Sequence, residues 1–178
     1  MRYAQYIVAG ALFWAMTACG PSVSPEFVKK VQEEYQNVEK SLPEKINALK
    51  GQVGTLRASL DTLKAKLGKI QPAKVEKDKE LSEQLKAIDE KINNIDTNLG
   101  TVEGDFNSIK SQLKSFVDGL ASPQKGEEEL KKEWEDQKDN LRKKQEALAK
   151  IQEEVDTLQA KINKLTEDIN KKYGTAKK

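Results

Sequence analysis

The sequence predicts an all-α protein, an elongated antiparallel three-helix coiled-coil bundle preceded by a signal peptide. Apolar residues recur at alternating steps of three and four along most of the chain. Two polar segments that contain proline divide this pattern into three stretches of similar length, and an apolar N-terminal segment ends at a cysteine. The alternating spacing places the apolar residues on one narrow stripe of a helix, as in coiled coils.

The composition narrows the class of protein. Charged residues make up 34% of the chain and aromatic residues 6%, as is typical of long helices and coiled coils. The chain has no histidine, the usual general base and the commonest metal ligand. Its charges are mixed in sign with a net of +2, whereas a nucleic-acid footprint is clustered and basic. We therefore expect no enzyme, metal site, cofactor or nucleic-acid partner.

Residues 1–18 read as a secretory signal peptide. Arg2 is followed by a largely apolar run over residues 3–16, which is shorter than the roughly 20 apolar residues of a transmembrane helix. The run leads into Thr17-Ala18-Cys19-Gly20, which resembles the lipobox of bacterial lipoproteins over residues 1–20. Met16 stands where that family prefers leucine. The resemblance implies cleavage before Cys19, acylation of its sulfur, and a membrane anchor at the new N-terminus.

Two other interpretations of the N-terminal segment stay open, an ordinary signal peptide with an incidental cysteine and an uncleaved membrane anchor. Gly20 in place of aspartate favours the outer membrane, by analogy with enteric bacteria. The only cysteine is Cys19, so no disulfide forms within the chain. Residues 19–26 form a short tether, in which Ser24 is expected to cap a helix with Pro25 at its first position.

The first helix is expected over residues 27–70. Its steps include one extra step of four around Pro43, which predicts a kink or a brief break there. Gly51 and Gly54 favour either close packing or a local weak point. Its apolar positions are Val28, Val31, Tyr35, Val38, Leu42, Ile46, Leu49, Val53, Leu56, Leu60, Leu63, Leu67 and Ile70.

The second helix is expected over residues 74–120, and its apolar stripe follows the heptad without exception. The stripe consists of Leu81, Leu85, Ile88, Ile92, Ile95, Leu99, Val102, Phe106, Ile109, Leu113, Phe116 and Leu120. The third helix is expected over residues 127–173 and opens with three glutamates at the positive end of its dipole. Gln137 and Lys144 occupy two of its seam positions, and the latter is interpreted as a register device. Residues 174–178 form a tail.

Short connections between helices of similar length favour antiparallel neighbours, so we expect a bundle over residues 27–173. In antiparallel helices, the numbers of two residues that lie at the same level have a constant sum. This sum should be about 145 for the first two helices and about 250 for the last two. The first helix is net positive and the second net negative, which favours their pairing. These sums gather Phe27, Val28, Phe116 and Trp134 at one level, at the end nearest Cys19. The alternative is an extended chain whose helices pair with other copies.

The C-terminal tail offers one further site. A lipobox cysteine, a heptad helix and a basic tail that contains tyrosine and ends in lysine also occur in the murein lipoprotein of enteric bacteria, which this chain resembles in its anchor and tail. The resemblance implies that Lys178 is joined to peptidoglycan. A soluble basic terminus is the alternative.

We therefore expect a lipid-anchored structural or interaction protein of the bacterial cell envelope. It would act as a spacer or coiled-coil scaffold for a protein or cell-wall partner, with self-association as an open alternative. Two other functions remain at this point, an accessory regulator of an envelope enzyme or transporter, and a surface-exposed binding protein or adhesin.

Overall fold

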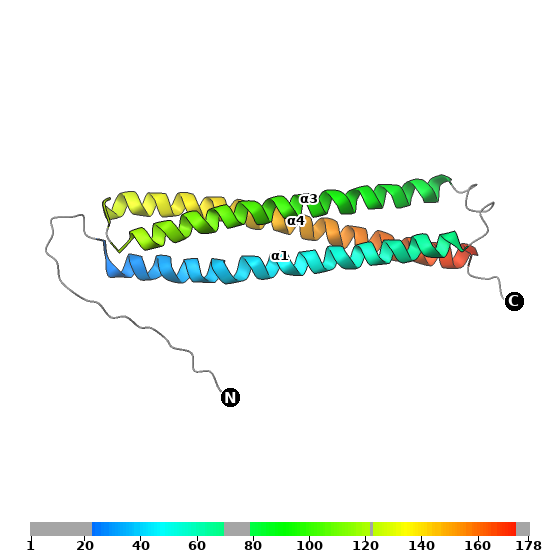
Figure 1. The fold of residues 1–178 in the computed structure, drawn as a ribbon, viewed down its shortest axis with the longest axis horizontal. Coiled ribbons are helices and arrows are strands. Elements are labelled where there is room, and N and C mark those ends of the chain that lie inside the picture. Colours follow the sequence, from blue (N-terminus) through cyan, green and yellow to red (C-terminus); the bar gives the residue numbers. More distant parts are fainter. Residues whose placement is uncertain (1–22, 70–78, 122, 174–178) are drawn as a thin grey trace, which may run out of the picture.

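The computed structural model describes residues 23–69, 79–121 and 123–173. Three helices follow one another along the chain: α1 (Pro25–Gly68), α3 (Lys79–Gly119) and α4 (Glu127–Tyr173). They lie side by side in a rod, with α1 and α4 running in one direction and α3 in the other (Figure 1). The 44 residues of α1 span roughly 66 Å at 1.5 Å per residue. The all-α antiparallel bundle that the sequence predicts is confirmed.

Local signals explain where the helices begin. The hydroxyl of Ser24 accepts a hydrogen bond from the backbone N–H of Phe27 at 3.3 Å, and Pro25 occupies the first turn of α1. This confirms the predicted cap, which satisfies one of the free donors at the helix start. The third helix begins at Glu127 and ends at Tyr173, as predicted.

Three helix ends differ from the expected ones by one or two residues. The first helix begins two residues before the predicted residue 27 and ends at Gly68, two residues before the predicted residue 70. The second helix ends at Gly119, one residue before the predicted residue 120. Its predicted start at residue 74 lies outside the described residues, and the helix is described from Lys79. Residues 70–78 lie outside the described part of the chain, as do Cys19, the tether up to residue 22 and the tail 174–178.

Of the kink or brief break predicted at Pro43, the break is wrong, because α1 continues through this residue. Proline has no backbone N–H to donate to the carbonyl of Glu39, one turn earlier. The flanking side chains nevertheless hold the helix in place, since Leu42 is 0% exposed and Ile46 is 2% exposed. Tertiary packing of the apolar stripe therefore outweighs the local preference for a break.

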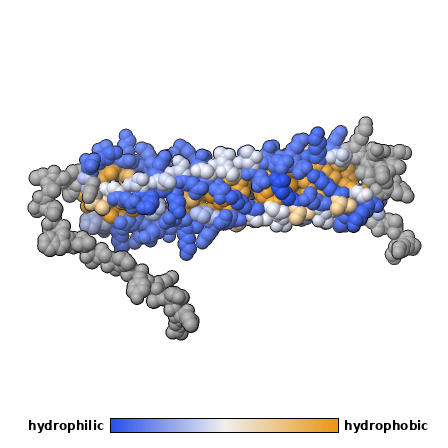
Figure 2. Space-filling model, viewed as in Figure 1, coloured by the Kyte–Doolittle hydropathy of each residue, from blue (hydrophilic) through white to orange (hydrophobic). Residues whose placement is uncertain are grey.

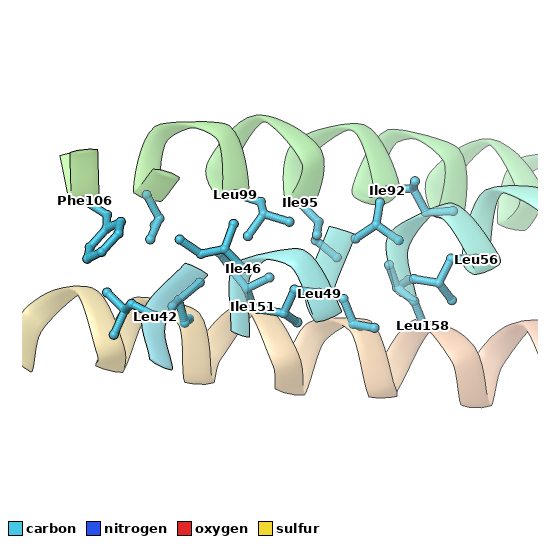
Figure 3. Packing of buried hydrophobic residues seen from close by; sticks show 14 of the residues in the cluster. Leu42, Ile46, Leu49, Leu56, Ile92, Ile95, Leu99, Phe106, Ile151 and Leu158 are labelled. Atoms are coloured by element: carbon cyan, nitrogen blue, oxygen red, sulfur yellow. The ribbon is translucent and has the colours of Figure 1, made fainter. Parts of the chain in front are cut away.

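The core is a single stripe along the axis of the rod, shared by all three helices (Figure 3). It consists only of apolar side chains, with no buried charged or polar residue among those described. Eleven of the twelve predicted stripe positions of α3 are buried, and Phe116 is half-buried. The heptad pattern thus identifies the core of α3 residue by residue.

The observed register confirms one predicted sum and corrects the other. Between α3 and α4, Asp105 pairs with Lys144, a sum of 249 against the predicted 250. Between α1 and α3, Lys50 pairs with Glu103, a sum of 153 against the predicted 145. The ion pairs therefore show that the stagger of α1 against α3 differs from the predicted one.

The corrected stagger moves one aromatic contact. Phe116 and Trp134 stack with ring centroids 5.6 Å apart, so these two lie at one level, as predicted. The indole N–H of Trp134 donates a hydrogen bond to Glu34 at 3.0 Å. The Trp134 ring therefore lies level with Glu34 of α1. The expectation that Phe27 and Val28 share this level is wrong.

The seam residue Gln137 leaves a buried oxygen, Oε1, without a hydrogen-bond partner in the described structure. Such an atom carries a desolvation penalty of about 1–3 kcal/mol. We therefore predict that Gln137→Leu raises the free energy of unfolding by about 1–2 kcal/mol, as measured by urea denaturation. Gln124→Leu, at an exposed position outside the helices, is the control and should change little. A Gln137→Leu protein no more stable than the wild type would show that this oxygen carries no penalty.

Candidate interaction surface along the α3–α4 groove

Chemical sites are scarce in the described part of the chain. It contains no group of three or more acidic, cysteine or histidine side chains placed to hold a metal ion. The two sites that the sequence singles out, Cys19 for lipidation and Lys178 for attachment, lie outside the described residues. The surface of the rod is therefore the candidate site, and its three grooves differ from one another.

The α1–α3 groove is closed by ion pairs along the rod. Each of four successive α3 positions, seven residues apart, pairs with a residue of opposite charge on α1. The pairs are Asp89 with Lys64, Asp96 with Arg57, Glu103 with Lys50 and Lys110 with Glu39, at 2.6 to 2.8 Å. Antiparallel helices bring such equivalent flanking positions opposite each other, and here every pair is attractive.

The α1–α4 groove is crossed mainly by hydrogen bonds, and one hollow of about 480 Å³ lies along it beside Glu34 and Lys138. Gln52 accepts one from Gln152 at 2.9 Å, near the middle of the rod. Near the start of both helices, the backbone N–H of Ser24 donates to Glu127 at 2.6 Å. Glu34 accepts from Trp134 between these two levels. These contacts hold α1 and α4 parallel to each other. Each residue of α1 lies level with the residue of α4 whose number is about 100 higher.

The α3–α4 groove is the least closed of the three. Among the described residues, one ion pair crosses it, between Lys144 and Asp105 at 2.6 Å. Three hollows lie along it, the largest with a volume of about 530 Å³ and the next along the groove with about 440 Å³. These two share Lys91 and Leu158, so they form one continuous groove in the half of the rod nearer Tyr173.

Charge explains why this groove stays open. Lys91 and Lys161 both line the larger hollow, one from each helix. They occupy the positions that face each other across an antiparallel seam, where α1 and α3 carry opposite charges. Two lysines at such positions repel each other, so at this level the seam between α3 and α4 lacks the attraction that closes the other antiparallel seam. Apolar side chains, Leu158 and Leu165, lie along its floor.

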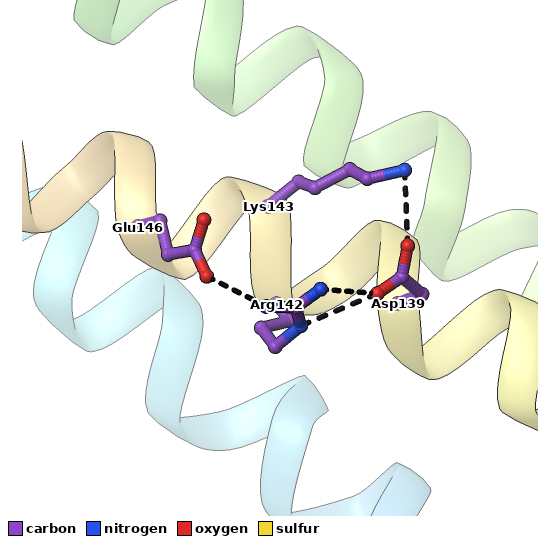
Figure 4. Close-up of polar contacts among 4 residues, drawn as sticks. All are labelled: Asp139, Arg142, Lys143 and Glu146. Atoms are coloured by element: carbon purple, nitrogen blue, oxygen red, sulfur yellow. Dashed lines mark hydrogen bonds and ion pairs between the residues drawn. The ribbon is translucent and has the colours of Figure 1, made fainter.

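Ion pairing within α4 changes abruptly along its length. Up to Glu146 the helix carries dense networks, such as Asp139 with Arg142 and Lys143, and Arg142 with Glu146 (Figure 4). From residue 147 to 171 none of its charged side chains forms an ion pair with another described residue. The second half of α4 therefore presents unpaired charges beside an open groove. On the face seen in Figure 2, where α4 lies behind the other two helices, apolar surface appears between hydrophilic side chains in the half of the rod nearer Tyr173.

Two carboxylates have pKa values that tie the fold to pH. A hydrogen bond from Lys110 lowers the pKa of Glu39, and the backbone N–H of Ser24 lowers the pKa of Glu127. Because the folded pKa is depressed, each group stabilises the fold above its unfolded pKa near 4.5, and this stabilisation is lost as the pH falls through the folded pKa.

We predict that acidification below about pH 4.5 lowers the melting temperature, and that Glu39→Gln/Glu127→Gln removes part of this dependence. The double variant should melt lower than wild type at pH 7 and converge with it at pH 3. Glu83→Gln, at an exposed position without an ion pair among the described residues, is the control. A double variant with the full acid dependence would show that these contacts do not link stability to pH.

The open groove was not found from the sequence. The heptad pattern predicts which residues are buried, and the like charges at residues 91 and 161 are visible in it. The facing pairs depend on the register between α3 and α4, and the predicted sum of about 250 is close to the observed one. Predicted sums alone place these residues within one turn of each other. What the pattern does not show is which grooves are bridged by ion pairs and which contain hollows.

No described helix has an apolar stretch long enough to cross a membrane. No protein-family model, curated protein or solved structure matches this chain.

Proposed function

We propose that this protein is a lipid-anchored spacer and coiled-coil scaffold of the bacterial cell envelope, which acts by geometry and without turnover. One observation supports the proposal above the others: α1 begins at one end of the rod and α4 ends at the opposite end (Figure 1). An anchor attached before α1 would hold the far end of α4 roughly 66 Å away, at 1.5 Å per residue.

The anchor itself rests on the lipobox-like residues that end in Cys19. Two or more acyl chains on one residue give stable membrane attachment, since each buried methylene contributes about 0.8 kcal/mol. The unpaired surface of α3 and α4 supplies a face on which a helical partner could pack, the usual mode of recognition for such a rod.

Cell fractionation and intact-mass measurement test the anchor. The wild-type chain should be found in the membrane fraction, starting at Cys19 with the added mass of its acyl groups. Cys19→Ser should lose this mass, and Ser22→Ala, in the same tether, should keep it. A wild-type chain without the lipid mass would overturn the anchored part of the proposal.

Energy transfer to a dye in the bilayer tests the spacer. A fluorophore at Glu128→Cys, near the start of α4, should transfer energy efficiently to the membrane dye. The same fluorophore at Asn170→Cys, near the end of α4, should transfer far less. Both positions are exposed. Equal transfer from the two positions would mean that the rod lies flat on the membrane, and the spacer function would fail.

The proposal that peptidoglycan is a partner depends on the C-terminal tail alone. Lys178 follows five residues after α4 ends at Tyr173. Muropeptide digestion followed by mass spectrometry should find a muropeptide on Lys178 if the tail is joined to peptidoglycan. An unmodified Lys178 would exclude attachment to peptidoglycan, and the scaffold would then bind a protein partner.

A further inference from the structure

The groove between α3 and α4 carries an ordered pattern of charge beside Leu158. This residue lies on the floor, where the two hollows of about 530 and 440 Å³ meet. On one side of it the rim is acidic, with Glu153 and Glu154. On the other side it is basic, with Lys161 and Lys164. None of these four side chains has an ion-pair partner within the described chain.

The pattern extends one step further in each direction. Lys150 lies fourteen residues before Lys164, at the same position of the heptad, and Asp168 lines the far end of the larger hollow. Both are exposed, and neither is ion-paired in the described structure. Among these six residues, the signs along α4 are plus, minus, minus, then plus, plus, minus, with Leu158 near the centre. The two other charged residues of this stretch, Asp156 and Glu167, are acidic and line neither hollow. Read backwards from Asp168, the second half of this order has the opposite sign to the first half at each position.

We propose that two copies of this chain pair through the α3–α4 groove as an antiparallel dimer, with a two-fold axis near Leu158. A rotation about this axis places each side chain opposite one of opposite charge in the second copy. The pairs are Lys150 with Asp168, Glu153 with Lys164, and Glu154 with Lys161, each formed twice. Such a self-complementary patch is what a two-fold interface requires.

Charge also selects the antiparallel arrangement. If two copies paired in parallel, each residue would face its own counterpart, and every one of these contacts would join like charges. The antiparallel arrangement further brings Glu154 of the second copy towards Lys91 and Lys161, whose mutual repulsion leaves the groove open. The contact is mainly electrostatic, so it should weaken as the salt concentration rises.

The dimer has a consequence that rests on the proposed anchor. From Leu158 back to Glu127, α4 covers about 47 Å, so the two starts of α1 would lie about 90 Å apart, at opposite ends of the paired rods. Anchored chains paired in this way would join two facing membranes rather than neighbours in one membrane. The pairing itself does not depend on the anchor and is tested in solution.

Sedimentation of the chain from Gly20 to Lys178 tests the pairing, because this chain keeps all described helices and contains no cysteine. The wild type should show a concentration-dependent dimer. Lys161→Glu/Lys164→Glu makes this part of the rim acidic, and Glu153→Lys/Glu154→Lys makes it basic. Each variant alone should dimerise at least about tenfold more weakly. An equal mixture should recover a heterodimer at least as tight as the wild type.

Matched controls distinguish an effect of this surface on dimerisation from an effect of net charge or of unfolding. Lys30→Glu/Lys40→Glu makes the same change of charge on α1, at exposed positions, and should leave the dimer unchanged. Lys161→Glu/Lys164→Glu removes the repulsion with Lys91, so its melting temperature should not fall. A monomeric wild type at all concentrations, or a mixture that stays monomeric, would overturn the proposal.

Single cysteines then test the orientation. Thr157→Cys lies next to the axis and should form a disulfide-linked dimer. Lys150→Cys should not link to itself, but should link to Asp168→Cys when the two proteins are mixed. Equal self-linking at residues 150 and 157 would show a parallel dimer and contradict the proposal, as would no linking at either position.

Discussion

Leu56→Ala is expected to lower the free energy of unfolding by about 2–5 kcal/mol, the range for leucine truncation in a packed core. Leu56 is 0% exposed and lies in the middle of the stripe shown in Figure 3. Its truncation removes contacts and leaves a cavity that three long helices cannot close by a small shift. Urea denaturation followed by circular dichroism measures the change.

The control for this prediction is Asp61→Ala, on the exposed side of the same helix, without an ion pair in the described structure. Surface substitutions of this kind change stability by about 0.5 kcal/mol or less. If the two variants lost equal stability, the stripe would not be the core of a packed bundle.

Replacing four helical glycines with alanine is expected to raise the free energy of unfolding by about 2–4 kcal/mol in total, at about 0.5–1 kcal/mol each. The four are Gly51, Gly54, Gly100 and Gly104. Each lies inside a helix, and an added Cβ would meet no atom within 4 Å. Alanine therefore introduces no clash. It also lowers the conformational entropy of the unfolded chain, so less entropy is lost on folding. Thermal and urea unfolding measure the gain.

Gly126→Ala is the matched control, because Gly126 also has open space around it but precedes α4. No gain is expected there. A quadruple variant no more stable than the wild type would show that these helices are not limited by their glycines.

These glycines also show what the sequence leaves open. Gly51 and Gly54 favour either close packing or a weak point, and the open space around both decides for the weak point. The ion pair between Lys50 and Glu103 places Gly51 and Gly104 at one level of the rod. Two helices are therefore weakened at the same level, near the middle of the bundle.

The fold class and the core could be predicted because each depends on spacing within one helix. Eleven of the twelve stripe positions from Leu81 to Leu120 are buried, as their steps of three and four require. The register between α1 and α3 could not, because it depends on how the chain passes between Gly68 and Lys79. The continuity of α1 at Pro43 could not either, since the packing of Leu42 and Ile46 overrides the local signal.

The candidate surface depends on register in the same way. The charges at Glu153, Glu154, Lys161 and Lys164 are plain in the sequence, and their places on a helix follow from the heptad. Which groove they line, and that no other described side chain neutralises them, follows only from the position of α4 against α3.

A distance between spin labels at Gln52 and Gln152 tests most directly whether the helices fold back on one another within a single chain. The labels are attached at Gln52→Cys and Gln152→Cys in the chain from Gly20 to Lys178. Because these side chains are hydrogen-bonded at 2.9 Å, the labels should report neighbouring helices, whose axes lie about 8–10 Å apart. Dilution with unlabelled protein should not change this distance. An extended helix would separate the labels by up to roughly 150 Å, and that result, or a short distance lost on dilution, would contradict the bundle.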